Sequence, residues 1–165
     1  AYDEAAVQRA QKLAQKKPFS GCPGMRAKQF QRSTAPAAGA ACPSQLSQWP
    51  VQIKLAGVMA PYFDDADLLI AADCTAYAYG NFHEKFIRGR ITLIGCPKLD
   101  AVDYAEKLTA IFAAHSIRSV TVARMEVPCC GGIEQAVQRA ITASGKAISC
   151  HVTVIGTDGT IQEER

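Results

Sequence analysis

No stretch of this 165-residue sequence is hydrophobic for long enough to cross a membrane. The longest apolar runs, such as residues 68–72, compare with the roughly 20 apolar residues that a spanning helix needs. The chain also begins with an acidic segment that lacks the apolar core of a secretory signal peptide. These absences argue against a membrane protein and predict a protein of the cytoplasm.

Several motifs that mark nucleotide-binding or hydrolytic enzymes are missing as well. There is no GxxxxGK[ST] phosphate-binding loop, no GxGxxG after the first predicted strand, and no Gly-x-Ser-x-Gly nucleophile motif. The net charge is +3, and residues 1–50 hold seven basic and two acidic side chains. Because no aromatic stripe is interleaved with these charges, we interpret them as a solvated helix face and expect no nucleic-acid partner.

The chain nevertheless contains seven cysteines. An odd number of cysteines in a protein without a secretory signal argues against a framework of disulfides. No two of them form a CxxC pair, so the spacings of zinc ribbons and of bacterial ferredoxins are both absent. In a reducing compartment, cysteines in this number indicate metal binding or thiol chemistry.

The hydrophobic pattern of residues 49–165 predicts one α/β domain. Alternating or continuous apolar residues predict strands at 51–55, 68–72, 91–94, 120–123 and 150–155. Helical spacing predicts a helix over 101–112 with Asp100 as its N-cap, and a second over 133–141 that stops at Gly145. Since strands that alternate with helices form right-handed crossovers, we expect a three-layer, Rossmann-like fold with a mostly parallel sheet of about five strands.

Residues 1–48 differ in character and are expected to pack on this domain. Residues 3–17 predict a helix, which is followed by a Gly-Cys-Pro-Gly loop and then by a linker rich in Ala, Ser, Pro and Gly. Near the other end of the chain, Asp158 and Gly159 predict a tight turn.

Four cysteines come just after predicted strands. Cys74 follows the second strand, Cys96 the third, and the adjacent Cys129 and Cys130 the fourth. In a parallel sheet the carboxyl ends of the strands lie at one edge, and open α/β sheets bind their ligands there. The sequence therefore predicts a thiolate-rich pocket at this edge. Buried, unreactive thiols are the alternative interpretation.

The surroundings of these cysteines suit such a pocket. Glycines flank several of them and let the backbone approach an inorganic core, while nearby helix N-termini favour the thiolate form. Lys98 would offset negative charge, and His83 is a candidate ligand or proton donor. Cys22, in the Gly-Cys-Pro-Gly loop, is a further candidate ligand, whereas Cys42 and Cys150 are given no role.

A resemblance to a known family rests on six short segments that are distributed over nearly the whole chain: Gly21–Gly24, Trp49–Pro50, Ala66–Cys74, Asn81–His83, Ile94–Asp100 and Met125–Gly132. Together they resemble the C-terminal region of the ferredoxin-like "4Fe-4S binding" proteins of anaerobes. In that family a ferredoxin module precedes this region, so the resemblance implies that this chain is the C-terminal domain alone. It also implies electron transfer with a ferredoxin module or a separate ferredoxin. The Cys-Cys-Gly element is similar to the paired cysteines of heterodisulfide-reductase subunits, which hold an unusual iron–sulfur cluster.

Our leading hypothesis is a redox domain that binds an iron–sulfur cluster, either a 4Fe-4S cubane or an unusual variant. The candidate thiolate ligands are Cys22, Cys74, Cys96, Cys129 and Cys130. A cubane needs four of them, so either one is spare or the cluster is not a simple cubane. An open metal position would allow an oxidoreductase to reduce a small molecule, with His83 and Lys98 as candidate catalytic residues.

Three other functions remain open. Thiolates suit zinc equally well, which predicts a colourless structural or sensory zinc domain. A metal-free thiol enzyme would use Cys129 and Cys130 as nucleophile and resolving thiol. A plain interaction module would dock through its basic N-terminal helix and would tolerate serine at each of these cysteines.

Overall fold

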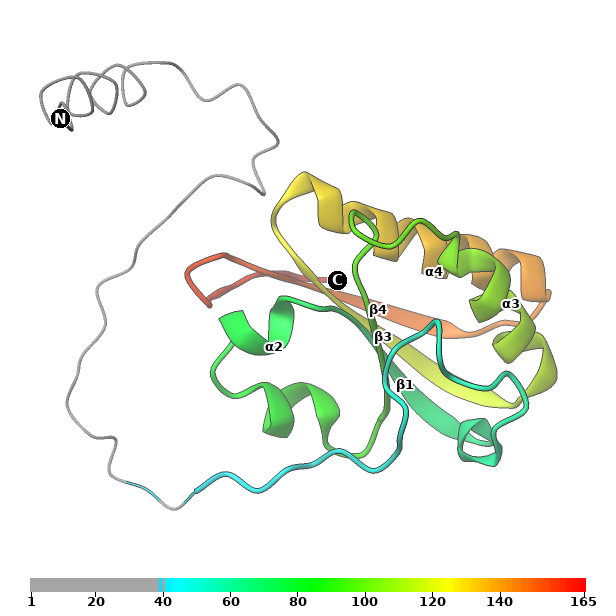
Figure 1. Ribbon diagram of the computed structural model, residues 1–165, viewed down its shortest axis with the longest axis horizontal. Helices are drawn as coiled ribbons and strands as arrows, with labels where there is room; N and C mark the ends of the chain where they lie inside the picture. The colour runs from blue at the N-terminus through cyan, green and yellow to red at the C-terminus, as the bar shows by residue number, and fades with distance from the viewer. Residues whose placement is uncertain (1–38, 40) are drawn as a thin grey trace, which may run out of the picture.

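The computed structural model of the chain describes residue 39 and residues 41–165 (Figure 1). The helix expected over 3–17 and the loop that contains Cys22 lie outside the described residues. The described part holds the whole of the expected α/β domain.

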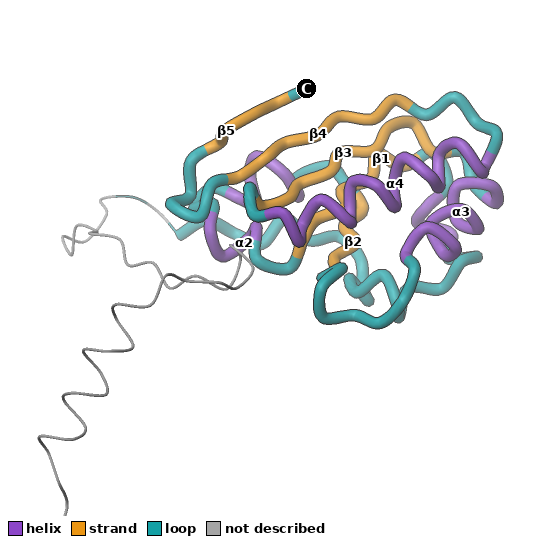
Figure 2. The backbone as a smooth tube through the Cα atoms, turned by 90° about the horizontal axis from the view of Figure 1, so that it is seen from above, coloured by secondary structure: helices purple, strands orange, loops and turns teal. Residues whose placement is uncertain are grey.

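A five-stranded sheet forms the centre of the domain, in the order β2–β1–β3–β4–β5 (Figure 2). The strands are β1 (Ala66–Ala72), β2 (Ile91–Gly95), β3 (Ile117–Met125), β4 (Ser149–Ile155) and β5 (Ile161–Glu164). β2, β1, β3 and β4 run parallel to one another, and β5 is antiparallel to β4. This confirms the predicted α/β fold with a mostly parallel sheet of five strands.

Helices lie on both faces of this sheet. They are η2 (Pro61–Phe63), α2 (Thr75–Ala78), η3 (His83–Ile87), α3 (Tyr104–Ala114), η4 (Pro128–Cys130) and α4 (Gly131–Ser144). Figure 1 shows α3 and α4 together on one face, and α2 with the green segment that follows it on the other. A cluster of buried hydrophobic side chains lies on each face, and residues 68–71 of β1 contribute alternately to the two. β1 is therefore covered on both sides, as its continuous apolar run predicts.

The two long helices form where the apolar spacing predicts them, but one cap differs. The N-cap of α3 is Asp103, whose side chain accepts a hydrogen bond from the N–H of Ala105 at 3.0 Å. The prediction that Asp100 caps this helix was wrong, because Asp100 instead accepts a hydrogen bond from the hydroxyl of Tyr104. α4 ends as predicted at Gly145, which has the left-handed conformation (φ 69°) that terminates many helices.

The strand predicted over 51–55 is not formed. Only Gln52 makes a parallel bridge, to Ile94 of β2, and the chain then turns. The alternating pattern was misleading because Ile53 is buried whereas Leu55 is 69% exposed. This segment covers the outer edge of β2 without extending the sheet, which protects an otherwise open strand edge.

The fifth strand of the sheet is instead β5, near the C-terminus. The turn predicted at Asp158 and Gly159 joins it to β4, and Gly159 has a positive φ of 91°, which glycine adopts at little cost. β5 has too few buried residues to give a strand pattern, since only Ile161 is partly covered.

None of the helices in the described part of the chain combines the length and the hydrophobicity that crossing a membrane requires.

The order of the strands also indicates where a ligand could bind. From β1 the chain moves to β2 on one side and then to β3 on the other, so the loops after β1 and β3 lead away in different directions. In open α/β sheets such a point, at the carboxyl ends of the strands, is where ligands bind.

Candidate thiol-rich site

The carboxyl ends of β2, β1 and β3 are neighbours, and each is followed by cysteine. Cys96 comes directly after β2, and Cys74 lies two residues after β1. Cys129 and Cys130 lie in η4, between β3 and α4. The structure therefore brings four of the five candidate cysteines to one edge of the sheet. The fifth, Cys22, lies outside the described residues.

These thiols are close enough to influence one another's ionisation. The pKa of the exposed Cys74 is raised by partial burial of its thiol, by Cys96, by Asp73 and by Cys129. Burial, with smaller contributions from Cys129, Cys74 and Cys96, raises the pKa of Cys130 to about 11, although a hydrogen bond with the Met125 backbone partly opposes this. Negative charge on the neighbouring thiols therefore makes Cys74 and Cys130 harder to ionise.

Cys130 also corrects an expectation about helix N-termini. It stands at the N-cap of α4, where the helix dipole favours a thiolate. Its side chain is only 7% exposed, however, and loss of hydration disfavours the charged form. Burial wins, so in the protein alone Cys130 holds its proton more firmly than an ordinary cysteine does.

The loop that carries Cys96 is held by a small polar cluster. The carbonyl of Cys96 accepts hydrogen bonds from the N–H groups of Leu99 (3.2 Å) and Asp100 (2.9 Å). The Asp100 carboxylate accepts a hydrogen bond from the Tyr104 hydroxyl. Burial is the main cause of the raised pKa of Tyr104, and this hydrogen bond is the second. The first turn of α3 thus fixes the direction in which the chain leaves β2.

Two glycines allow these segments to come together. At Gly95, a methyl group would lie 2.5 Å from the hydroxyl oxygen of Tyr104, so only glycine leaves room for this ring beside β2. At Gly132, a methyl group would lie 3.0 Å from Cβ of Pro97. The loop after β2 therefore packs directly on the first turn of α4, which brings Cys96 towards the cysteine pair.

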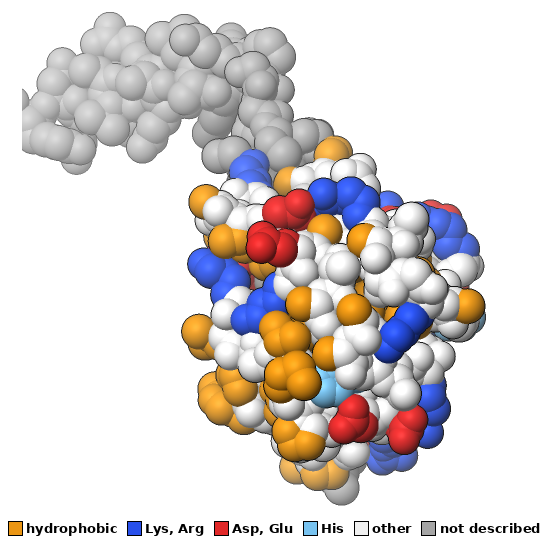
Figure 3. All heavy atoms as spheres, turned by 90° about the vertical axis from the view of Figure 1, so that its right-hand side faces the viewer, with side chains coloured by type: hydrophobic (Ala, Val, Ile, Leu, Met, Phe, Trp, Pro, Cys, Tyr) orange, Lys and Arg blue, Asp and Glu red, His pale blue; other side chains and the backbone are white. Residues whose placement is uncertain are grey.

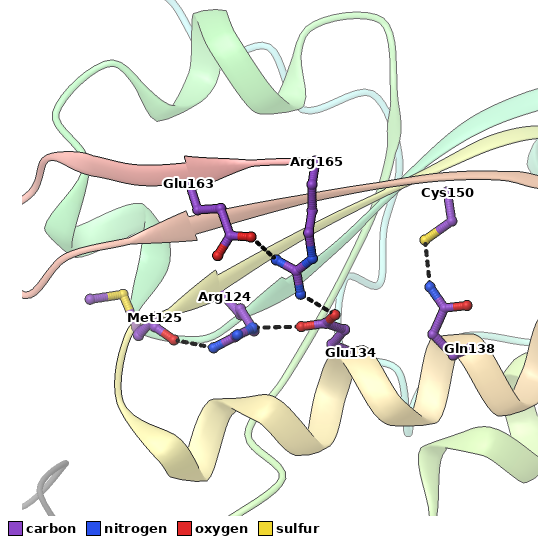
Figure 4. A network of polar contacts seen from close by, with 7 residues as sticks. All are labelled: Arg124, Met125, Glu134, Gln138, Cys150, Glu163 and Arg165. Atoms are coloured by element: carbon purple, nitrogen blue, oxygen red, sulfur yellow. Dashed lines mark hydrogen bonds and ion pairs between the residues drawn. The ribbon is translucent and has the colours of Figure 1, made fainter.

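A partly buried ion-pair network anchors the same helix to the sheet (Figure 4). Arg124 of β3 donates from Nε to Glu134 of α4 at 2.7 Å and from Nη1 to the carbonyl of Met125 at 3.1 Å. Arg165, after β5, pairs with the other oxygen of Glu134. The network lies one turn beyond η4 and so fixes where α4, and the cysteines before it, sit relative to β3.

Asp73 lies between β1 and Cys74, and sequence reasoning gave it no role. Its backbone N–H donates to the carbonyl of Gly95 at 3.1 Å, so β1 and β2 stay joined up to the cysteines. Its Oδ1 atom is buried and has no hydrogen-bond partner among residues 41–165, and burial, followed by the nearby charge of Asp100, raises the pKa of Asp73. The one signal in the sequence that could have pointed to Asp73 is its position directly before the candidate ligand Cys74.

The two candidate catalytic residues take different places. Lys98 is exposed in the turn after Cys96. His83 begins η3, and its Nδ1 accepts a hydrogen bond from the backbone N–H of Gln45 at 3.0 Å. His83 lines a cavity together with Asp73, and none of the described cysteines lines that cavity.

The remaining cysteines in the described part of the chain do not join the site. Cys42 is exposed in the segment before the sheet. Cys150 lies near the start of β4, at the other end of the strands, where Nε2 of Gln138 donates to its sulfur at 3.5 Å (Figure 4). Both were left out of the predicted ligand set.

Within residues 41–165, no three His, Cys, Asp or Glu side chains are grouped closely enough to hold a metal ion. The described cysteines converge on one edge but do not form a ready-made site for a single ion.

Comparison with known proteins identifies the family. The model of the family described as "Rossmann-like domain" matches residues 60–165, and the chain belongs to this family. The chain is also similar to an "Uncharacterized protein" of Archaeoglobus fulgidus, with 28% identity over 118 residues that cover 72% of this chain and 84% of the archaeal protein. No solved structure matches the chain.

Proposed function

We propose that this domain holds an iron–sulfur cluster at the carboxyl edge of its sheet and takes part in electron transfer. The observation that carries the proposal is the convergence of four cysteines from three neighbouring strand ends, where the pKa values of Cys74 and Cys130 are raised by burial and by the neighbouring cysteines. The resemblance to "4Fe-4S binding" proteins of anaerobes supports the same proposal, as does the absence of a nucleotide-binding motif from the sequence.

The electrostatics of the four thiols favour a positively charged core between them. Burial and mutual repulsion oppose the thiolate form of Cys74 and Cys130 while the protein is alone. A nearby cation reverses this balance, since it favours deprotonation of each thiol that it binds. Such a cluster would supply one-electron exchange, and backbone N–H groups and burial would tune its potential.

A cluster and a single zinc ion would arrange the four sulfurs differently. Around one zinc ion, four sulfurs at about 2.3 Å must crowd into one tetrahedron. Each thiolate of a cluster binds a different iron, so the sulfurs stand further apart around a larger core. The four described candidate thiols, which come from three neighbouring strand ends, would supply one ligand for each iron of a cubane.

The metal-free thiol enzyme is less well supported. Its two thiols would be Cys129 and Cys130, and thiol exchange needs an available thiolate and a leaving thiol of low pKa. With a pKa of about 11, Cys130 fills either role poorly near neutral pH.

A redox partner would find an apolar surface beside the site. Tyr77 and Leu99 each lie three residues beyond a candidate ligand and are 93% and 81% exposed. Figure 3 shows another face on which hydrophobic side chains gather between charged ones. Aromatic and aliphatic side chains around a cluster are suited to the small, transient interfaces of electron-transfer partners, of which a ferredoxin is the one that the family resemblance implies.

Metal analysis of the whole chain, purified without oxygen, tests the proposal. Iron, zinc and acid-labile sulfide are measured with an absorption spectrum on the same sample, before and after anaerobic reconstitution. We expect several irons per chain with matching sulfide and a brown colour. Zinc alone, or no metal after reconstitution, would refute the cluster.

Serine variants then assign the ligands. Cys74→Ser, Cys96→Ser and Cys129→Ser should each lower the iron content or change the spectrum, since serine is a poor ligand for iron in a cluster. Cys150→Ser is the matched control, because this cysteine lies at the other end of β4 and should leave both unchanged. Equal iron in all four variants would show that the cluster, if present, is bound elsewhere.

A further inference from the structure

A cavity of about 370 Å³ lies on the face of the sheet that α2 and η3 cover. Its floor is made by residues of β1 and β2, among them Ala71 and Ile94, and its walls include Phe82, Ile87 and Leu46. None of the described cysteines lines it, so it is distinct from the thiol-rich site, although Asp73 and Thr75, on either side of Cys74 in the sequence, both line it. Its size falls within the range of small-molecule sites, and its walls are largely apolar, as is usual for them.

Two buried side-chain atoms in the described part of the chain have no hydrogen-bond partner, and both belong to residues that line this cavity. They are Oδ1 of Asp73 and Oγ1 of Thr92. Thr92 is only 2% exposed. An unsatisfied buried polar atom typically costs about 1–3 kcal/mol, so two such atoms in one cavity call for a common explanation.

The protein satisfies the neighbouring backbone but leaves the hydroxyl of Thr92 free. The side chain of Gln48 donates to the carbonyl of Thr92 and accepts from its N–H at 3.2 Å, as an adjacent strand would. This pairing fills both backbone positions on the outer edge of β2. The Thr92 hydroxyl remains available to a ligand inside the cavity.

A third polar group has a defined proton position. Nδ1 of His83 accepts a hydrogen bond from the N–H of Gln45, so the proton of the neutral ring is on Nε2. His83 therefore adds a hydrogen-bond donor to a cavity in which Asp73 offers an acceptor.

The two unpartnered atoms are at opposite ends of the cavity floor. Thr92 pairs with Leu69 across the sheet, and Asp73 lies four residues beyond Leu69 along β1. At about 3.3 Å per residue, the two positions are separated by about 13 Å in the direction of the strands. A ligand that reaches both must be elongated, with an apolar body and a polar group at each end.

We propose that this cavity binds a small organic amine that carries a second hydrogen-bonding group, such as a hydroxyl, at the opposite end of an apolar body. The amine donates to the carboxylate of Asp73, the acceptor to which it binds most strongly, and the far hydroxyl pairs with Thr92. The apolar body lies against the walls near Phe82 and Ile87. The inference goes beyond the proposed cluster and does not depend on it.

Three related probes test the two ends separately. Tyramine has an amine and a phenolic hydroxyl, phenethylamine lacks the hydroxyl, and 4-ethylphenol lacks the amine. Each is titrated into the isotope-labelled chain while backbone amide signals are followed by NMR. We expect tyramine to bind most tightly and to shift signals of residues 71–75 and 92–94. The titration needs no metal, so its result is independent of iron binding.

Two variants complete the test. Asp73→Asn should weaken tyramine and phenethylamine about tenfold or more and leave 4-ethylphenol unchanged, because only the amines lose a charge-assisted bond. Thr92→Val should weaken tyramine and 4-ethylphenol and spare phenethylamine. Oδ1 of Asp73 and Oγ1 of Thr92 have no partner among the described residues, so both variants should fold, which a thermal unfolding curve verifies. The proposal is overturned if no probe binds, if the shifts lie away from the cavity, or if Asp73→Asn binds tyramine as tightly as the original chain.

Discussion

Adjacent glycines at the start of α4 allow a sharp test of how the thiol-rich site is assembled. Gly131 and Gly132 both lie in the first turn of the helix, but a methyl group would meet nothing within 4 Å at Gly131 and would lie 3.0 Å from Cβ of Pro97 at Gly132. Alanine is a better helix former than glycine by up to about 1 kcal/mol. Gly131→Ala should therefore raise the free energy of unfolding by up to about 1 kcal/mol.

Gly132→Ala gains the same helix propensity but crowds the loop after β2. Inserting a methyl group where there is no room typically costs about 1–3 kcal/mol, unless the neighbouring segment moves. We expect Gly132→Ala to be less stable than Gly131→Ala by about 1–3 kcal/mol, which corresponds to roughly 2–4 °C in melting temperature for each kcal/mol. If the Pro97 loop moves instead, Cys96 moves with it, and the iron content of the reconstituted protein should fall in Gly132→Ala alone.

The assay is urea unfolding of both variants and the original chain in the same buffer, with iron analysis after reconstitution. Equal slopes in urea would show that the denatured state has not changed. Equal stability and equal iron content in the two variants would refute the reasoning, because the packing of Pro97 on α4 would then not constrain the site.

Two further outcomes follow from buried titratable groups. His115 is 5% exposed, and its two ring nitrogens face a carboxylate oxygen of Asp64 (2.6 Å) and the carbonyl of Val58 (2.7 Å). His115→Ala should therefore lower the free energy of unfolding by about 2–4 kcal/mol, whereas the exposed control His151→Ala should change it by less than about 0.5 kcal/mol in the same denaturation assay. A loss below about 1 kcal/mol in His115→Ala would contradict this role. The pKa of Cys130 rises from 9.0 to about 11 on folding, so its contribution to stability is complete below pH 9. Between pH 9 and 11 the free energy of unfolding of the metal-free protein should fall by about 2–3 kcal/mol on this account. Unfolding curves measured across this pH range should show a shallower decline in stability for Cys130→Ala than for the original chain.

Much of the fold was predictable because its signals are local. The apolar run at 68–72 is long enough to be a strand covered on both faces, and the spacing of apolar residues in α3 and α4 matches a helix regardless of what they pack on. Gly145 and Gly159 end their elements through their own backbone conformations. Such features depend on neighbours in sequence, so a reader of the sequence can find them.

The errors occurred where residue type alone does not decide. Asp100 and Asp103 are both acceptable N-caps by residue type, and only the structure shows that Asp103 caps the helix while Asp100 accepts a hydrogen bond from the Tyr104 hydroxyl. The alternation around Ile53 predicted a strand. In the structure, the edge of β2 is covered by the side chain of Gln48, which bonds to the backbone of Thr92, and by a single backbone bridge at Gln52, so no further strand forms. A short segment at the edge of a sheet has a neighbouring strand on one side only, so its own sequence pattern specifies its pairing weakly.

The candidate site divides in the same way. The sequence by itself determined that Cys74, Cys96 and the pair after β3 would share one edge, because all parallel strands end on the same side of a sheet. Only the tertiary structure decided that β2, β1 and β3 are neighbours, that Cys130 is buried enough to keep its proton, and that Asp73 faces a cavity without a partner. Burial and hydrogen bonding depend on which distant segments meet, and no local pattern of residues records that.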